Sequence, residues 1–446
     1  MIVLLSLVLL ADPRAKTVDV SGGGTTELRG GRAPINPGDD PEPSVLYLLQ
    51  PIGRLHFSAR ARAQGVVLTY SPRVMYRSPN PAGLNRPLLL HQATAAYSRR
   101  LSQIWTSNAF AGADVGELDY TSAQNLFGEQ QGSLPDADIT KYASTTAGLG
   151  FVGRIHPVQQ LTIAPSVDYR TPYGESAVEP DPDDENALET LLPRQVGANL
   201  NLRHAYDVAP VDTLIAEVAI QYVDFSERGA QAIGVGTYGW TRQLSRRLAS
   251  TVRAGTFATV ETRAPDGIER TFTGSPVQPL VAAELDGRLY NRAPLRISGS
   301  FGFSNAAFVD SVTGEVVPRV GAFSRLSFFM PPKWTVGLEV NFTTVATREP
   351  RDFSLGGDDG IADPAAQQET ALSWRTPVSV AFRDNYAVEF GTIWSVRGPH
   401  VRAGGFQFRQ LESWLYVAFS FDYATGHVRA RQAGGGGSTV TGGDVN

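Results

Sequence analysis

Apolar and polar residues alternate with a period of two along most of the chain. The segments 161–170, 195–203, 295–304 and 334–343 each place large apolar side chains at every second position and polar ones between them. Successive side chains of a β-strand point to opposite faces, so each such strand has one apolar and one polar face. Beyond residue 16 no sustained stretch repeats with the period of a helix. The pattern predicts an all-β chain.

The links between the predicted strands alternate in length. Short links lie near residues 62–65, 99–103, 155–159, 206–211, 245–247, 291–294, 330–333 and 383–386. Longer segments rich in Pro, Gly, Asp and Asn separate them, such as 116–140, 171–193 and 346–367. A soluble sandwich also has alternating strands, but it gives no reason for this regular change of link length. Outer-membrane barrels have short periplasmic turns and longer external loops, which accounts for it.

The length and number of the strands point to the same architecture. Many predicted strands exceed ten residues, and a tilted strand needs about 9 to 11 residues to cross the hydrocarbon of a membrane. Two strands for each short link, a glycine-rich strand at Thr17 to Arg29 and a last strand at Phe406 to Tyr423 give about eighteen. We therefore predict a transmembrane antiparallel up-and-down β-barrel over residues 16–423. An even number of strands places both chain ends in the periplasm.

The two ends of the chain differ from the predicted barrel. The apolar run Ile2 to Ala11 has the length of a signal-peptide core and precedes small and polar residues, so residues 1–15 are interpreted as a signal peptide, with a buried strand as the alternative. No apolar run reaches the roughly 18 to 20 residues of a helical membrane span. Residues 424–446 contain Gly434 to Gly437 and are expected to form a flexible tail.

Composition and motifs exclude several classes of function. The chain has no cysteine, its net charge is -5, and its six histidines lack metal-ligand spacing. The sequence Gly234 to Gly239 matches G-x-G-x-x-G inside a strand pattern with no following helix, so it does not indicate a dinucleotide site. We expect no metal, no cofactor, no nucleic-acid partner and no enzymatic activity. Acidic residues of the long segments, such as Asp181 and Asp358, are interpreted as solvated, with divalent bridging to lipopolysaccharide as the alternative.

The polar faces of the predicted strands carry charges of both signs. A charge on the lipid face costs about 2 to 4 kcal/mol at the midplane, so most of these side chains are predicted to face the lumen. Basic residues exceed acidic ones, and many are expected to form ion pairs, while the remaining arginines would attract anions. The predicted lumen-facing basic residues are Arg54, Arg60, Arg73, Arg170, Arg203, Arg253, Arg288, Arg296, Arg319, Arg325 and Arg375, with His56 among them. The acidic ones are Asp168, Glu217, Glu261, Glu284, Asp286, Glu339, Glu389 and Glu412.

Aromatic residues gather near the short links, where an interfacial girdle is expected. The general preference of aromatic residues for strands is the alternative explanation. The residues interpreted as this girdle are Tyr97, Trp105, Trp240, Tyr290, Phe328, Phe329, Trp334 and Tyr386.

Two features resemble known families. The segment Leu415 to Tyr423 resembles the terminal strand that the barrel-assembly machinery recognises, although here a tail follows it. The size, strand number and arginine-rich lumen over residues 17–423 resemble the eighteen-strand barrels that export acidic exopolysaccharides such as alginate, without a specific sequence motif. A barrel of this size leaves an aqueous channel.

The resemblance to exopolysaccharide exporters implies an export channel in the bacterial outer membrane, surrounded by lipid and lipopolysaccharide. It also implies a periplasmic polysaccharide-export component as a partner. The alternatives are an uptake porin for small anions or sugars and, outside transport, an outer-membrane adhesin or enzyme.

Overall fold

The computed structural model describes residues 17–33, 44–60, 63–78, 86–119, 139–174, 194–225, 230–263, 277–309, 316–331, 333–345, 370–382, 385–398 and 410–424. The predicted signal peptide and all but the first residue of the predicted tail lie outside these residues. Among the described residues, no helix is long and apolar enough to cross a membrane.

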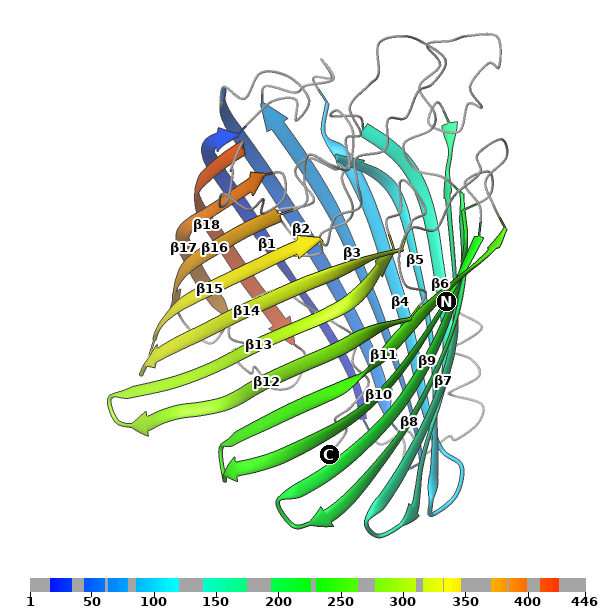
Figure 1. The fold of residues 1–446 in the computed structure, drawn as a ribbon. Coiled ribbons are helices and arrows are strands. Elements are labelled where there is room, and N and C mark those ends of the chain that lie inside the picture. Colours follow the sequence, from blue (N-terminus) through cyan, green and yellow to red (C-terminus); the bar gives the residue numbers. More distant parts are fainter. Residues whose placement is uncertain are drawn as a thin grey trace, which may run out of the picture.

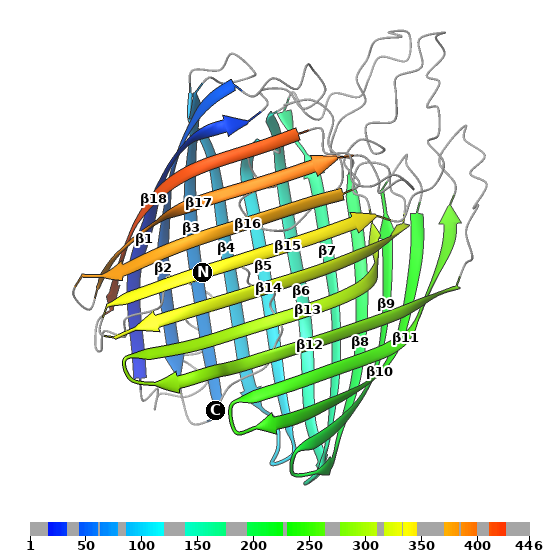
Figure 2. The same cartoon turned by 60° about the vertical axis from the view of Figure 1, so that its left-hand side comes forward.

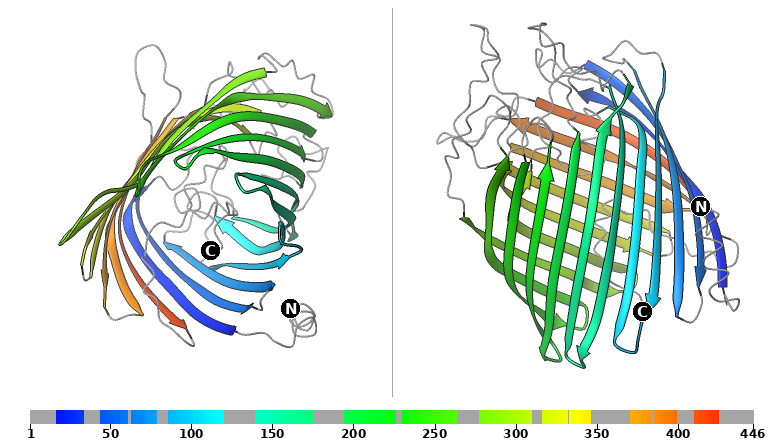
Figure 3. Two further views of the ribbon diagram at one scale, coloured as in Figure 1. Left: turned by 90° about the horizontal axis from the view of Figure 1, so that it is seen from below. Right: turned by 90° about the vertical axis from the view of Figure 1, so that its right-hand side faces the viewer.

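Eighteen antiparallel strands form a single closed sheet (Figure 1). Consecutive strands pair with one another, and β1 pairs with β18 to complete the ring seen from below in Figure 3. The predicted fold class and strand number are therefore confirmed. The strands are β1 (Thr17–Ala33), β2 (Ser44–Arg60), β3 (Gln64–Ser78), β4 (Leu88–Arg100), β5 (Trp105–Asp119), β6 (Ile139–His156), β7 (Gln159–Pro172), β8 (Gln195–Ala209), β9 (Asp212–Asp224), β10 (Ala230–Ser245), β11 (Leu248–Arg263), β12 (Val277–Arg292), β13 (Leu295–Val309), β14 (Val316–Met330), β15 (Trp334–Val345), β16 (Thr370–Ala381), β17 (Tyr386–Gly398) and β18 (Gln410–Ala424).

The short links gather at one end of the barrel. The two-residue links after β6, β8, β10 and β12 lie together at the lower end of Figure 1. Figure 2 shows β12 to β18 on one wall of the barrel and β3 to β8 on the opposite wall. The predicted alternation of short and longer links follows the strand order, because each short link joins two strands and a longer segment leads to the next pair.

The glycine-rich first strand closes the barrel. Gly31 lies opposite Trp414 of β18, and a methyl group at Gly31 would overlap the carbonyl oxygen of Ser413. The absence of a side chain therefore allows β1 and β18 to approach closely. We call the junction of β1 and β18 the seam. The glycines that make β1 poor in apolar residues therefore also allow it to form the seam.

Candidate functional site: the inner wall of the barrel

The two faces of the sheet differ sharply in side chains. Cross-strand partners share a face, so the pairing assigns every described strand residue to one side or the other. One face carries exposed apolar side chains, such as Leu149 at 49% and Leu415 at 68% exposure. The other carries most of the charged residues and includes Tyr416 at 2% and Glu389 at 7% exposure. In a closed barrel the first is the outer face and the second is the inner face.

Aromatic side chains of the outer face lie near both ends of the strands. Trp105, Trp334 and Tyr386 begin strands at the short-link end. Trp374 and Trp394 stack on one another near the opposite end, with ring centroids 5.8 Å apart. Phe329 is a correction to the predicted girdle. It pairs with Arg296 and Thr335, whereas its neighbour Phe328 lies on the outer face with Ile297. Two adjacent strand residues cannot share a face, so only one of them belongs to the girdle.

The strand pairing places the residues predicted to line the lumen on one face of the sheet. Of the predicted set, the Glu261 side chain lies outside the described part of the structure. The basic residues on this inner face are Arg54, Arg60, Arg73, Arg170, Arg203, Arg253, Arg288, Arg296, Arg319, Arg325 and Arg375. The acidic ones are Asp168, Glu217, Glu284, Asp286, Glu339, Glu389 and Glu412.

On one side of the barrel the inner face is closed by its own side chains. Arg375 donates a hydrogen bond from Nη2 to Glu389 Oε1 at 2.5 Å and another from Nε to the Tyr416 hydroxyl at 3.0 Å. That hydroxyl donates to the same Glu389 oxygen at 2.9 Å. The guanidinium carbon also lies 4.6 Å from the centroid of the Tyr416 ring. Three strands, β16, β17 and β18, are joined by this triad.

The same closed surface continues across the seam. Arg29 of β1 forms an ion pair with Glu27 and is 3% exposed. The Gln50 amide on β2, oriented with its oxygen toward Arg73 of β3, accepts from Arg73 Nη2 at 2.5 Å. We call the inner faces of β17, β18, β1, β2 and β3, with Arg375, the packed wall. The sequence analysis did not include Glu27, Arg29 and Gln50 among the lumen-facing residues. Glu27 and Arg29 are two positions apart, as are residues 48 and 50, and this spacing could have identified a shared face.

A looser polar network lies on the neighbouring strands β7 to β11. Glu217 accepts from Asn201 at 2.6 Å and lies 3.5 Å from Arg253 Nη1. Asp168 accepts from Gln195 and Asn199, each at 3.3 Å. Side-chain amides therefore contribute hydrogen bonds to two of the predicted acidic residues, Asp168 and Glu217.

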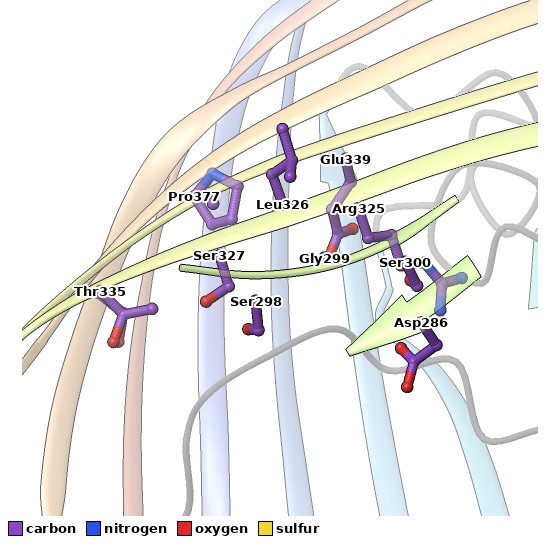
Figure 4. A pocket seen from close by; sticks show the side chains of 12 residues that line it. Asp286, Ser298, Gly299, Ser300, Arg325, Leu326, Ser327, Thr335, Glu339 and Pro377 are labelled. Atoms are coloured by element: carbon purple, nitrogen blue, oxygen red, sulfur yellow. The ribbon is translucent and has the colours of Figure 1, made fainter. Parts of the chain in front are cut away.

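The inner face of β12 to β16 is open. A hollow of about 180 Å³ lies there, shown in Figure 4. The side chains that line it come from five neighbouring strands and include five hydroxyl groups. We call this surface the hydroxyl wall, and its inner-face residues are Asp286, Ser298, Ser300, Arg325, Ser327, Thr335, Glu339 and Ser379.

Two phenylalanines extend the hydroxyl wall along β14. Phe323 lies opposite Gly302, and Phe329 lies opposite Arg296. The Arg325 guanidinium is 5.5 Å from the Phe323 ring centroid, and that of Arg296 is 5.8 Å from the Phe329 centroid. The sequence analysis did not assign either ring to the lumen. Strict alternation through Phe323, Arg325, Ser327 and Phe329 was the signal that could have done so.

Among the described residues, no group of three or more His, Asp or Glu side chains could hold a metal ion.

No protein-family model matches the chain, and no curated protein matches it. Solved structures of outer-membrane proteins resemble it across most of its length. The outer membrane protein OpdK from Pseudomonas aeruginosa is 8% identical, with a TM-score of 0.43, and the match covers 92% of this chain and 99% of that one. OccAB3 from Acinetobacter baumannii is 9% identical with a TM-score of 0.42, covering 91% and 99%. The FrpB iron transporter from Neisseria meningitidis is 9% identical with a TM-score of 0.46, covering 91% and 82%.

Proposed function

We propose that this chain forms a water-filled channel through the bacterial outer membrane. The observation that carries the proposal is the closed barrel of eighteen strands with an apolar outer face and a polar inner face. Barrels of sixteen to eighteen strands leave an aqueous lumen, whereas eight strands are filled by side chains. The exposed apolar outer side chains suit lipid, and the aromatic residues near both strand ends suit the two membrane interfaces.

The orientation follows from the link lengths. Short turns of outer-membrane barrels face the periplasm, so we assign the short-link end and both chain termini to that side. Lipopolysaccharide would then surround the opposite end, and the barrel-assembly machinery would insert the chain. These partners are part of the proposal.

The exposed charges of the inner face favour anions. Of the predicted lumen residues, six arginines are exposed, Arg54, Arg60, Arg203, Arg288, Arg296 and Arg325, against two exposed carboxylates, Glu284 and Asp286. Glu389 and Glu412 are buried in the packed wall. An arginine that meets the aqueous path raises the local concentration of anions and binds carboxylates with two parallel hydrogen bonds. The cargo we propose is a hydrophilic polymer that carries acidic groups, exported as a polysaccharide. Uptake of small anions or sugars through the same lumen is the second candidate, and the open hydroxyl wall is the observation that favours it.

Reconstitution in a planar lipid bilayer tests the channel. We expect stepwise conductance and, across a potassium chloride gradient, a reversal potential of the sign given by anion preference. Arg325→Glu should shift that potential toward cation preference. Arg242→Glu, at an exposed arginine on the outer face paired with Asp212, changes the charge equally and should shift it less. A protein that inserts without conductance contradicts the channel, and an unchanged potential in Arg325→Glu contradicts the role of the inner arginines.

The direction of transport needs cells. Deletion of the gene should remove an acidic polysaccharide from the cell surface and medium, and adjacent genes should encode a periplasmic export component. Unchanged surface polysaccharide together with slower entry of small sugars would replace export with uptake.

A further inference from the structure

The fold does not use the hydroxyl groups of the hydroxyl wall. Within the part of the chain that the structure describes, the hydroxyls of Ser298, Ser300, Ser327, Thr335 and Ser379 make no hydrogen bond. Elsewhere on the inner face the Thr241 and Thr251 hydroxyls bond to one another at 3.0 Å, and the Tyr416 hydroxyl donates to Glu389. A polar group that bonds to no other side chain remains available to water or to a ligand.

An aromatic side chain, Phe323, lies on the same strand and the same face as Arg325 and Ser327. Gly302 lies directly across from Phe323, and a methyl group at Gly302 would overlap ring atoms of Phe323. The Phe323 ring therefore lies over Gly302. Arg325, which lines the hollow, lies two positions further along the same strand, and its guanidinium carbon is 5.5 Å from the ring centroid. A flat apolar surface thus stands next to a group of hydrogen-bonding side chains.

The charges around the hollow are mixed. Arg325 lies opposite Glu339 in the strand pairing and opposite Ser300 on the other side, and Asp286 lies opposite Ser300 from β12. Figure 4 shows Arg325 and Asp286 at the same end of the hollow. A bare phosphate or sulfate would meet two carboxylates and one guanidinium, so repulsion opposes it. A ligand with many hydroxyls can donate to the carboxylates and accept from the guanidinium and the serines.

We propose that the hydroxyl wall, together with Phe323, binds an uncharged sugar unit as it passes through the channel. This inference rests on the proposed channel and adds to it a sugar-binding site on the inner face of β12 to β16. The sugar ring stacks its apolar face on Phe323, and its hydroxyls bond to Ser300 and Glu339, one inner-face position further along the strands. The next unit of an oligomer then reaches Ser298 and Ser327, about 13 Å from Phe323 at 3.3 Å per residue. The site selects the hydroxylated ring itself, whereas the exposed arginines elsewhere act on acidic groups of a cargo.

The test uses the full chain in a planar bilayer, with neutral glucose oligomers and glucuronic acid oligomers of equal length as probes. We expect the neutral oligomer to interrupt the current in a concentration-dependent way, at least as effectively as the acidic one. Phe323→Ala should raise the concentration for half-maximal interruption about tenfold, the scale of losing one buried aromatic contact. The double variant Ser298→Ala with Ser327→Ala should raise it as well.

Phe110→Ala is the matched control. Phe110 is an inner-face phenylalanine on β5 that also covers a glycine, Gly148, and it is 41% exposed, but it lies on the wall opposite β12 to β16. Its loss should leave the half-maximal concentration unchanged, while normal conductance in every variant shows that each has folded. Equal effects of Phe110→Ala and Phe323→Ala, or an open channel that neutral oligomers never interrupt, would overturn the sugar site. Absence of any conductance would instead overturn the proposed channel.

Discussion

Replacement of Glu389 by glutamine should destabilise the barrel more than the same change at a carboxylate of an exposed inner-face ion pair. Glu389 is 7% exposed and accepts from both Arg375 and Tyr416 through one oxygen. The variant Glu389→Gln keeps the shape but removes the counter-charge of a guanidinium whose side chain is 26% exposed. Removing one partner of a buried ion pair costs about 3 to 5 kcal/mol. Because Arg375 keeps some exposure and its contact with the Tyr416 ring, we expect about 3 kcal/mol.

Two further variants separate the parts of this triad. Tyr416→Phe keeps the ring over Arg375 and removes the hydroxyl that bonds to both partners, so we expect about 2 kcal/mol. Glu217→Gln is the matched control, because its partner Arg253 has a side chain that is 37% exposed and lies 3.5 Å away. Loss of a pair with that much exposure costs about 1 kcal/mol or less.

The assay is equilibrium unfolding in guanidinium chloride from lipid vesicles, followed by tryptophan fluorescence. The single variants Arg375→Gln and Glu389→Gln and the double variant that combines them form a double-mutant cycle. Its coupling energy should be about 2 kcal/mol or more. If Glu389→Gln costs no more than Glu217→Gln, burial does not strengthen the triad. The expectation that the buried triad of the packed wall stabilises the barrel more than the exposed pair would then be wrong.

Two other substitutions test the seam and the outer face. Gly31→Ala should lower the yield of folded barrel and cost about 1 to 3 kcal/mol, because its methyl group would overlap β18 backbone; Gly30→Ala, with 3.5 Å to Tyr47, should fold normally in the same refolding assay. Leu149→Arg on the outer face should cost about 2 to 4 kcal/mol in vesicles, whereas Thr146→Arg on the inner face should be nearly neutral. Equal costs for the last pair would contradict the assignment of faces.

Much of the fold could be predicted because a membrane barrel repeats one local pattern. Alternation sets the face of each residue, and the change between short and longer links sets the pairing of neighbours in sequence. The seam is different, since β1 meets β18 across almost the whole chain. Alternation indicates that Glu27 and Arg29 share a face, but only closure brings them beside Tyr416. The packed wall therefore could not be seen in any local segment.

The candidate site was only partly predictable for a related reason. Ser298 and Ser300 were recognised as polar positions, yet nothing local distinguishes a hydroxyl that bonds within the wall from one that lines a hollow. The hollow also depends on Gly337 of β15 and Pro377 of β16. Glycine has no side chain and the proline ring is short, so both leave space on the inner face. Phe329 was assigned to the wrong face because the pair Phe328 and Phe329 fits a girdle in either register. The pairing with Arg296 and Thr335 decides it.

The number of inner arginines does not measure the charge that a solute meets. Arg73 is 3% exposed and Arg375 is held by Glu389, so both act within the packed wall and contribute little to the aqueous path. Arg54, Arg60, Arg203, Arg288, Arg296 and Arg325 are exposed, and they lie on strands β2, β8, β12, β13 and β14. A solute in the lumen therefore meets only part of the predicted arginine set, because the remaining side chains are partly or fully covered by the wall itself. Anion preference should accordingly depend on these six exposed arginines rather than on all eleven.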